Sequence, residues 1–348
     1  MGASPTTWRA LLAAPAVRFD DHEYDIADLV LLALAEGTWQ ALHERLSRGL
    51  NLEREHGRGV APARVDDELR RFRYERRLIA GKDLRDWLFA RVLDIGALRR
   101  HCLRRLLLEA HDEAHEDTVV EGVEAELRVE AICSGTLAGA CARLVDLAAM
   151  SAGAEPATQS SAHTIATLGT LVRAHPEAGL ADLAGGGLDA RVQTIGRLLT
   201  AEADFVRRTA TAEQVRRCVA EHGVDWLRVD CSELTLPSEG AARESMLCLR
   251  LDRMPLAHLC ELLETAPRSR AHYLDELTDG SAPLLASAAI GDPVGPLQGA
   301  DGWRVLVVHE RVPPDGGDPE VVRRATAALV ASARERAKAG RAHALAVL

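Results

Sequence analysis

Apolar residues recur every three to four positions through much of residues 25–222, the spacing that places them on one face of an α-helix. This periodicity predicts helices at about residues 25–37, 39–56, 65–81, 83–96, 98–110, 119–132, 137–150, 164–174, 191–205 and 211–222. Capping residues support these bounds, as with Asp25 at the start of the first helix and Gly37 at its end. Short helices of this kind bury their apolar faces only against one another, so the segment is expected to form a helical bundle.

The pattern changes after Val224. Trp226 to Cys231 alternates like a strand, and Pro237-Ser238 precedes a helix. A second helix follows around residues 256–263, residues 273–277 are extended or loop, and residues 284–290 form a short helix.

A hairpin closes this region. Residues 294–298 and 303–309 are the expected strands, and Gly299 to Gly302 form the tight turn between them. Pro293 and Pro296 cannot donate backbone hydrogen bonds, so the first strand is expected at a sheet edge. Asp318-Pro319 then starts a final helix that runs to about residue 338.

Composition narrows the class of protein. The chain of 348 residues is 47% hydrophobic but only 3% aromatic, and its net charge of −10 argues against a general nucleic-acid binder. Seven scattered cysteines without a Cys-x-x-Cys motif are typical of free thiols in a reducing compartment. No signal peptide or long apolar segment is evident, so we expect a cytoplasmic protein that does not enter the membrane.

The order of these motifs resembles a known family. A Val-Gly-Pro strand, a glycine-containing turn and the run Gly302-Trp303-Arg304 followed by Val-Leu-Val-Val resemble the C-terminal hairpin of parvulin-type peptidyl-prolyl isomerases. Residues 20–110 look like the N-terminal helical module of SurA-type chaperones. Parvulin-related proteins encoded with ribosomal peptide natural-product pathways, which belong to the PpiC-related group, are similar as well.

The resemblance implies an α+β fold with a mostly helical N-terminal and middle region and a small C-terminal parvulin-like α/β domain. We expect a SurA-like helical domain at residues 1–110, a helical middle region at 111–222, a parvulin-like domain at 223–315 and a C-terminal helix at 316–348. It also implies a peptide or unfolded polypeptide as client. From the acidic net charge and the lack of a long apolar segment we expect no nucleic acid and no membrane as partner, and we expect no cofactor and no metal.

The expected pocket departs from the family pattern. Active parvulins resemble one another in two pocket histidines, whereas here Cys231 or a neighbour falls at the first position and Arg304 at the second. A charged guanidinium in place of a neutral imidazole changes both the volume and the field of a site that must favour a twisted amide. We therefore predict a peptide-binding chaperone or adaptor whose pocket contains Cys231, Trp303 and Arg304, with a client such as a natural-product precursor.

Other interpretations remain open from the sequence. Trp303 could be hairpin core and Arg304 a surface cation. The chain could be an active prolyl isomerase, or an enzyme with Cys231 as nucleophile and His258 or His309 as its partner. His111 and His115, four residues apart on a helix, have the spacing of a two-histidine metal pair.

Overall fold

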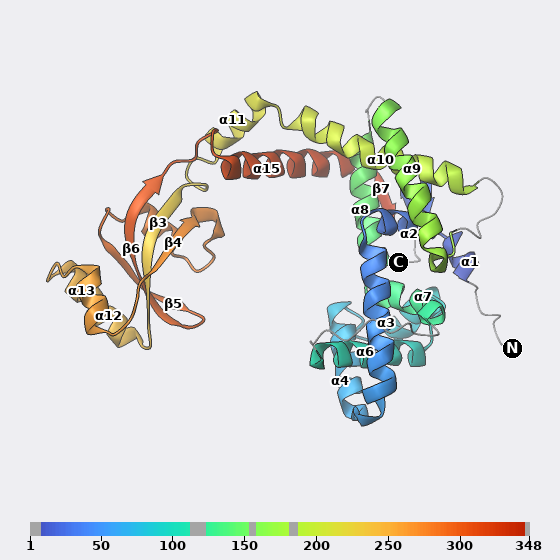
Figure 1. Cartoon of the computed structure of the whole chain (residues 1–348), viewed down its shortest axis with the longest axis horizontal. Helices are drawn as coiled ribbons and strands as arrows, with labels where there is room; N and C mark the ends of the chain where they lie inside the picture. The colour runs from blue at the N-terminus through green and yellow to red at the C-terminus, as the bar shows by residue number, and fades with distance from the viewer. Residues whose placement is uncertain (1–7, 112–122, 153–157, 181–186, 345–348) are drawn as a thin grey trace. The chain divides into compact units, whose positions relative to one another are not determined.

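A computed structural model describes residues 8–111, 123–152, 158–180 and 187–344. These residues form two compact units (Figure 1). Unit 1 comprises residues 1–205 and 333–348, and unit 2 comprises residues 206–332. The predicted fold class, α+β with a mostly helical N-terminal and middle region and a small C-terminal sheet domain, is confirmed. The likeness of that sheet domain to parvulins stays a prediction. The finer division into four segments stays a prediction.

Unit 1 is a helical assembly whose sequence-predicted helices are all present. Its helices are α1 (Trp8–Leu12), α2 (Ile26–Ala35), α3 (Thr38–His56), α4 (Pro62–Glu75), α5 (Gly81–Ala90), α6 (Ile95–Ala110), α7 (Val123–Cys133), α8 (Thr136–Ser151), α9 (Thr158–Ala174) and α10 (Gly187–Thr209), with 3-10 turns η1 (Gly57–Gly59) and η2 (Pro176–Ala178). The last residues of α10, from Val206 onward, belong to unit 2. Most observed bounds lie within a few residues of those predicted, because local capping and glycine signals set them.

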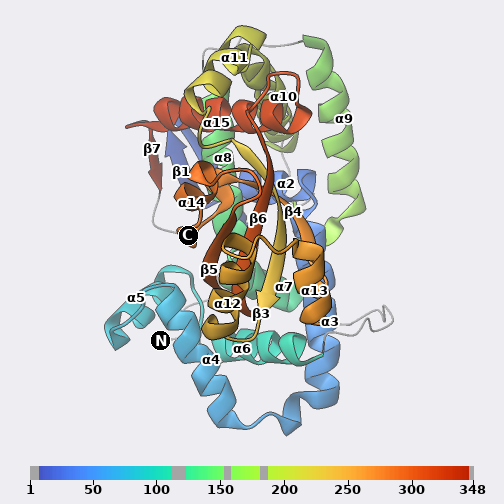
Figure 2. The same cartoon turned by 90° about the vertical axis from the view of Figure 1, so that its left-hand side faces the viewer.

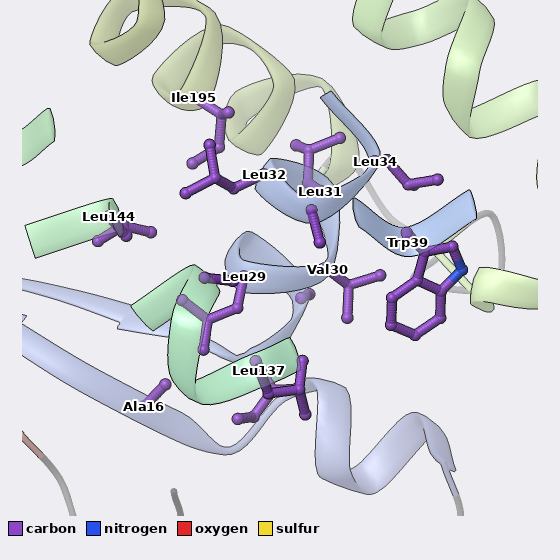
Figure 3. Close-up of a cluster of buried hydrophobic side chains, with 14 of the residues drawn as sticks. Ala16, Leu29, Val30, Leu31, Leu32, Leu34, Trp39, Leu137, Leu144 and Ile195 are labelled. Carbon is purple, nitrogen blue, oxygen red and sulfur yellow. The ribbon is translucent and has the colours of Figure 1, made fainter. Parts of the chain in front are cut away.

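Helix α2 is the centre of the largest core. Nearly all its residues are buried, and Leu29, Val30 and Leu32 meet side chains from several other elements. Figure 3 shows them beside Trp39 of α3 and Leu144 of α8. A helix that is apolar on every side needs partners on every side, which explains why this short helix is surrounded.

A small three-stranded sheet adjoins this core, with β1 (Pro15–Phe19) between β2 (His22–Asp25) and β7 (Ala342–Ala344). Both pairings are antiparallel, and Arg18 of β1 lies opposite His343 of β7. Neither β2 nor β7 was predicted from the sequence. The β7 segment is three residues long and pairs with a strand more than three hundred residues earlier, so local sequence carries no signal for it.

Unit 2 contains a four-stranded antiparallel sheet in the order β4-β3-β6-β5. Its strands are β3 (Arg228–Leu236), β4 (Arg268–Tyr273), β5 (Pro293–Gly299) and β6 (Gly302–Val312). The predicted hairpin is therefore present, and its proline-containing strand β5 lies at an edge as expected. Strand β4 was not predicted: the Arg-Ser-Arg-Ala-His-Tyr segment lacks β-branched residues and takes its conformation from pairing with β3.

Helices pack on the sheet of unit 2. Helix α12 (Glu239–Arg250) begins at the predicted cap Ser238 and, with α13 (Leu256–Leu262), covers one face (Figure 2). The other face packs against the 3-10 turn η3 (Leu274–Glu276) and α14 (Ala282–Ser287). A separate cluster joins α11 (Ala212–Glu221) to α15 (Pro319–Lys338) around Trp226, which is buried.

The lengths and apolar content of the described helices bear on whether they could cross a membrane. No single helix among the described residues is both long and apolar enough to cross a bilayer. The bent helix pair 126–133 and 136–151 has the required length and apolar composition only when its two helices are taken together. Within unit 1, many of the apolar side chains of that pair lie in the main core.

Candidate peptide-binding site

The candidate site is an open pocket of about 680 Å³ on one face of the sheet in unit 2. It collects residues from all four strands, the segment after η3 and the β5–β6 turn. The lining residues are Glu233, Thr235, Arg268, Arg270, His272, Glu276, Leu277, Thr278, Asp279, Gln298, Gly299, Ala300, Asp301, Gly302 and Arg304. The lining is therefore predominantly polar and charged.

Strand register brings the polar side chains together. Arg268, Arg270 and His272 alternate along β4, so all three point to the same face of the sheet. In the β3–β4 pairing Arg268 lies opposite Glu233, which also lines the pocket. This pairing places the pocket residues of β4 next to those of β3.

Arg304 of β6 is held between two carboxylates. Its guanidinium forms an ion pair with Asp279, and a second nitrogen lies 3.9 Å from an oxygen of Glu233. The Nε atom is buried and has no hydrogen-bond partner among the described residues. A Cβ at Gly299 would approach that Nε to 3.0 Å, so the glycine leaves the room that the arginine occupies.

Asp279 is held in place and kept ionised by its contacts with Ser281 and Arg304. The hydroxyl and the backbone N–H of Ser281 both donate hydrogen bonds to one carboxylate oxygen. Burial opposes ionisation of Asp279, but the hydrogen bonds from Ser281 and the charge of Arg304 outweigh it and lower the pKa of this carboxyl below its ordinary value. The carboxylate therefore remains ionised at neutral pH and fixes the direction of Arg304.

The three residues predicted to bind peptide are not brought together. Arg304 lines the pocket, whereas Trp303, its neighbour on β6, points to the opposite face and packs against the cluster beneath α12 and α13. Cys231 is 2% exposed and lies in the apolar cluster beside the pocket. Of the three, only Arg304 contributes directly to the pocket lining.

The structure does not support Cys231 as a nucleophile. Burial, followed by the charge of Glu233, raises the pKa of Cys231 to about 11. His309 shares a 2.7 Å hydrogen bond with Ser232, whose side chain points to the opposite face of β3 from Cys231. His258 is exposed on α13 beside Glu261. Neither histidine meets the thiol.

The predicted metal pair lies partly outside the described residues, since His115 is not among them. The ring of His111 stacks on that of His56, with centroids 4.5 Å apart. Within the part of the chain that the structure describes, no group of three or more histidine, cysteine or acidic residues is arranged to hold a metal ion.

Sequence reasoning missed most of the pocket, including Arg268, Arg270, His272, Glu233 and Asp279. One signal was present: basic residues alternate at positions 268, 270 and 272, a period of two that places them on one face of a strand. Asp279 gave no local signal, because its partner Arg304 lies 25 residues further along the chain.

Comparisons with known proteins add little to this geometry. No family model matches the chain, and no curated protein matches it. A solved SurA-like chaperone of Campylobacter jejuni is similar at 10% identity over 59% of this chain and 82% of that chain, with a TM-score of 0.19. PrsA from Bacillus subtilis is similar at 11% identity over 61% of this chain and 86% of that chain, with a TM-score of 0.22. Likenesses this weak carry no argument for function.

Proposed function

We propose that this chain is a parvulin-like chaperone or adaptor that binds extended polypeptide segments in the pocket of unit 2. The observation that carries the proposal is the pocket itself, about 680 Å³ in volume and bounded by an edge strand of the sheet. Extended peptides are commonly bound by the exposed edge of a sheet, where backbone groups give affinity and neighbouring side-chain pockets give specificity.

The chemistry of the pocket favours binding over prolyl isomerisation. The barrier to rotation about a peptide bond is about 18–20 kcal/mol, and catalysis must stabilise a twisted amide. Here Arg304 is already engaged by Asp279 and Glu233, and its charged side chain is part of the pocket lining. We infer a pocket that holds a peptide without accelerating its isomerisation, so a protease-coupled proline-peptide assay is expected to show the background rate.

The client and the location belong to the same proposal. A precursor in the maturation of ribosomal peptide natural products, bound in the cytoplasm, is the client that the sequence resemblance suggests. The geometry of the pocket supports only the more general class, a polypeptide in extended conformation.

Titration of fluorescently labelled unfolded peptides tests the proposal. The wild-type chain is expected to bind, and Arg304→Ala to bind at least about tenfold more weakly, because the collapse of the Arg304–Asp279 pair reshapes the pocket. Arg243→Ala is the matched control: Arg243 is an exposed arginine on α12 that pairs with Glu239 and does not line the pocket. Absence of binding by the wild type, or equal binding by Arg304→Ala, would contradict the proposal.

A further inference from the structure

Two arginines of the pocket, Arg268 and Arg270, have no ionic partner among the described residues. Arg268 and Arg270 are exposed on β4, and no carboxylate of the described residues lies within 4.0 Å of either guanidinium. Glu233 is opposite Arg268 in the register, yet its carboxylate is directed to Arg304. In a chain with net charge −10, two unpaired cations side by side on one strand are available to an external anion.

The other charges of the pocket do not neutralise them. Asp279 is paired with Arg304, and Glu276 is paired with Arg324 of α15. Asp301 lies in the turn between β5 and β6, and in the strand order β4-β3-β6-β5 these two strands are at the other end from β4. The carboxylates that line the pocket are thus engaged by other arginines or lie away from β4.

Strand β4 is also an edge strand of the sheet. Within the described residues, β3 is its only neighbour, which leaves its second edge unpaired. The opposite edge, β5, contains Pro293 and Pro296, which lack the N–H that strand pairing needs. Strand β4 contains no proline, so each of its residues retains its backbone donor and acceptor.

The spacing of the arginines specifies what such a strand should carry. Residues two apart on a strand are about 6.5–7 Å apart and share a face. A strand added beside β4 has its own alternate side chains at the same spacing and on the same side. Asp or Glu at alternate positions of that strand would therefore meet Arg268 and Arg270 in turn.

His272 lies on the same face of β4 as Arg268 and Arg270. It follows Arg270 by two residues and faces the same pocket. Its Nε2 atom is buried and has no hydrogen-bond partner in the described part of the chain. A buried polar atom without a partner is costly, so a ligand that supplies one is favoured.

We propose that β4 binds an acidic extended segment by strand addition, with carboxylates at alternate positions pairing with Arg268 and Arg270. The inference rests on the proposed function, because it names the class of peptide that the same pocket takes. Charged residues on an edge strand also protect against unwanted pairing. That role alone predicts no preference for acidic peptides, so the two explanations give different results.

The experiment compares three labelled ten-residue peptides on the full chain by fluorescence anisotropy. The peptides share valines at one set of alternate positions and carry Glu, Gln or Lys at the other set. The Glu peptide is expected to bind about tenfold tighter than the Gln peptide at low salt, and this advantage should shrink as salt is added. The Lys peptide should bind most weakly.

Variants assign the preference to the two arginines. The double variant Arg268→Gln/Arg270→Gln should bind the Glu and Gln peptides equally. The charge reversal Arg268→Glu/Arg270→Glu should prefer the Lys peptide, and Arg243→Gln on α12 should behave as the wild type. Equal binding of Glu and Gln peptides by the wild type overturns this inference but leaves the proposed function standing, whereas binding of none of the peptides removes both.

Strand addition has its own test. Two versions of the Glu peptide are N-methylated at one or the other set of alternate residues, so that each version blocks one edge of the bound strand. Pairing with β4 through one edge predicts that only one version loses binding. Equal affinities of the two methylated versions would contradict strand addition.

Discussion

At the scale of single residues, Arg304 defines the pocket because the protein supplies its counter-charges. Asp279 comes from a loop and accepts hydrogen bonds from Ser281, and Glu233 is placed by the pairing of β3 with its two neighbouring strands. Arg304 therefore shapes the pocket, while Arg268 and Arg270 provide positive charge that no carboxylate of the described residues neutralises. The arginines of the pocket differ in role because carboxylates of the described residues pair with Arg304 and not with Arg268 or Arg270.

Removal of Arg304 should leave two carboxylates without their cation. We expect Arg304→Met to lower the free energy of unfolding by about 1–2 kcal/mol, because Asp279 and Glu233 then lose a charged partner in a partly buried site. The double variant Arg304→Met/Asp279→Asn should be less destabilised than the sum of the two single variants. Urea denaturation followed by tryptophan fluorescence measures all four proteins, and strictly additive effects would show that the pair is not coupled.

The thiol of Cys231 is expected to be unreactive. With its pKa raised to about 11 by burial and by the charge of Glu233, its thiolate is scarce at pH 8. Reaction with iodoacetamide should be at least about a hundredfold slower than that of a model thiol with a pKa of about 8.5. Peptide mass spectrometry follows Cys231 alone, and the urea-unfolded chain provides the fast reference. A rate near that reference in the folded chain would show that the thiol is activated or accessible.

At the scale of elements, the helices that local capping and periodicity specify were predicted from the sequence. Strands that depend on pairing with a distant segment were missed. Helix α12 begins after Ser238 because its side chain accepts from the N–H of Ala241, a contact within four residues. Strand β4 depends on β3, which ends about thirty residues earlier, and its own side chains are mostly exposed. The helical scaffold could therefore be predicted from sequence, whereas one complete wall of the pocket could not.

The first turn of α2 gives a pH-dependent prediction. Burial, reinforced by the charge of Asp25, raises the pKa of Asp28 to about 6, compared with 3.8 for a free side chain. Between these values the folded chain binds more protons than the unfolded chain, so this group makes folding more favourable as the pH falls. Asp28 is 5% exposed, which allows the effect to be substantial despite its contact with Arg191.

Comparison with Asp28→Asn isolates this effect. Between pH 7.5 and pH 5.0 the wild type should gain about 1–3 kcal/mol of stability relative to the variant, because the variant has no group to protonate at this position. Denaturation curves of both proteins at several pH values provide the measurement, and contributions from other groups cancel in the difference. A stability difference that stays constant with pH, or that changes in the opposite direction, would contradict the raised pKa of Asp28.

At the scale of the whole molecule, the site required information that no single segment contains. Glu233, Arg268, Asp279 and Arg304 come from three strands and a loop, and only the sheet order makes them neighbours. Trp303 and Arg304 show the limit of sequence reasoning: adjacent residues were assigned to one pocket, but strand alternation sends them to opposite faces. Hydrophobic periodicity predicted the individual helices and the hairpin, and the family resemblance implied the α+β class, whereas the charge arrangement depends on tertiary pairing.

The two compact units have separate cores, which predicts two unfolding transitions. Leu32 is fully buried in the core of unit 1, and Leu306 is 2% exposed in a core of unit 2. Replacement of either leucine by alanine should cost about 2–5 kcal/mol, because it removes buried surface and leaves a cavity. Each cost should fall on the transition of one unit, since small domains unfold cooperatively.

Differential scanning calorimetry distinguishes the transitions, and tryptophans identify them. Trp39 lies in unit 1 and Trp226 in unit 2, so single-tryptophan variants report on each unit separately. Leu32→Ala should lower the midpoint reported by Trp39 and leave that of Trp226 in place, and Leu306→Ala should do the reverse. A single transition that both substitutions shift equally would mean that the units unfold as one cooperative body, because the loss of either core would then remove the stability of the other.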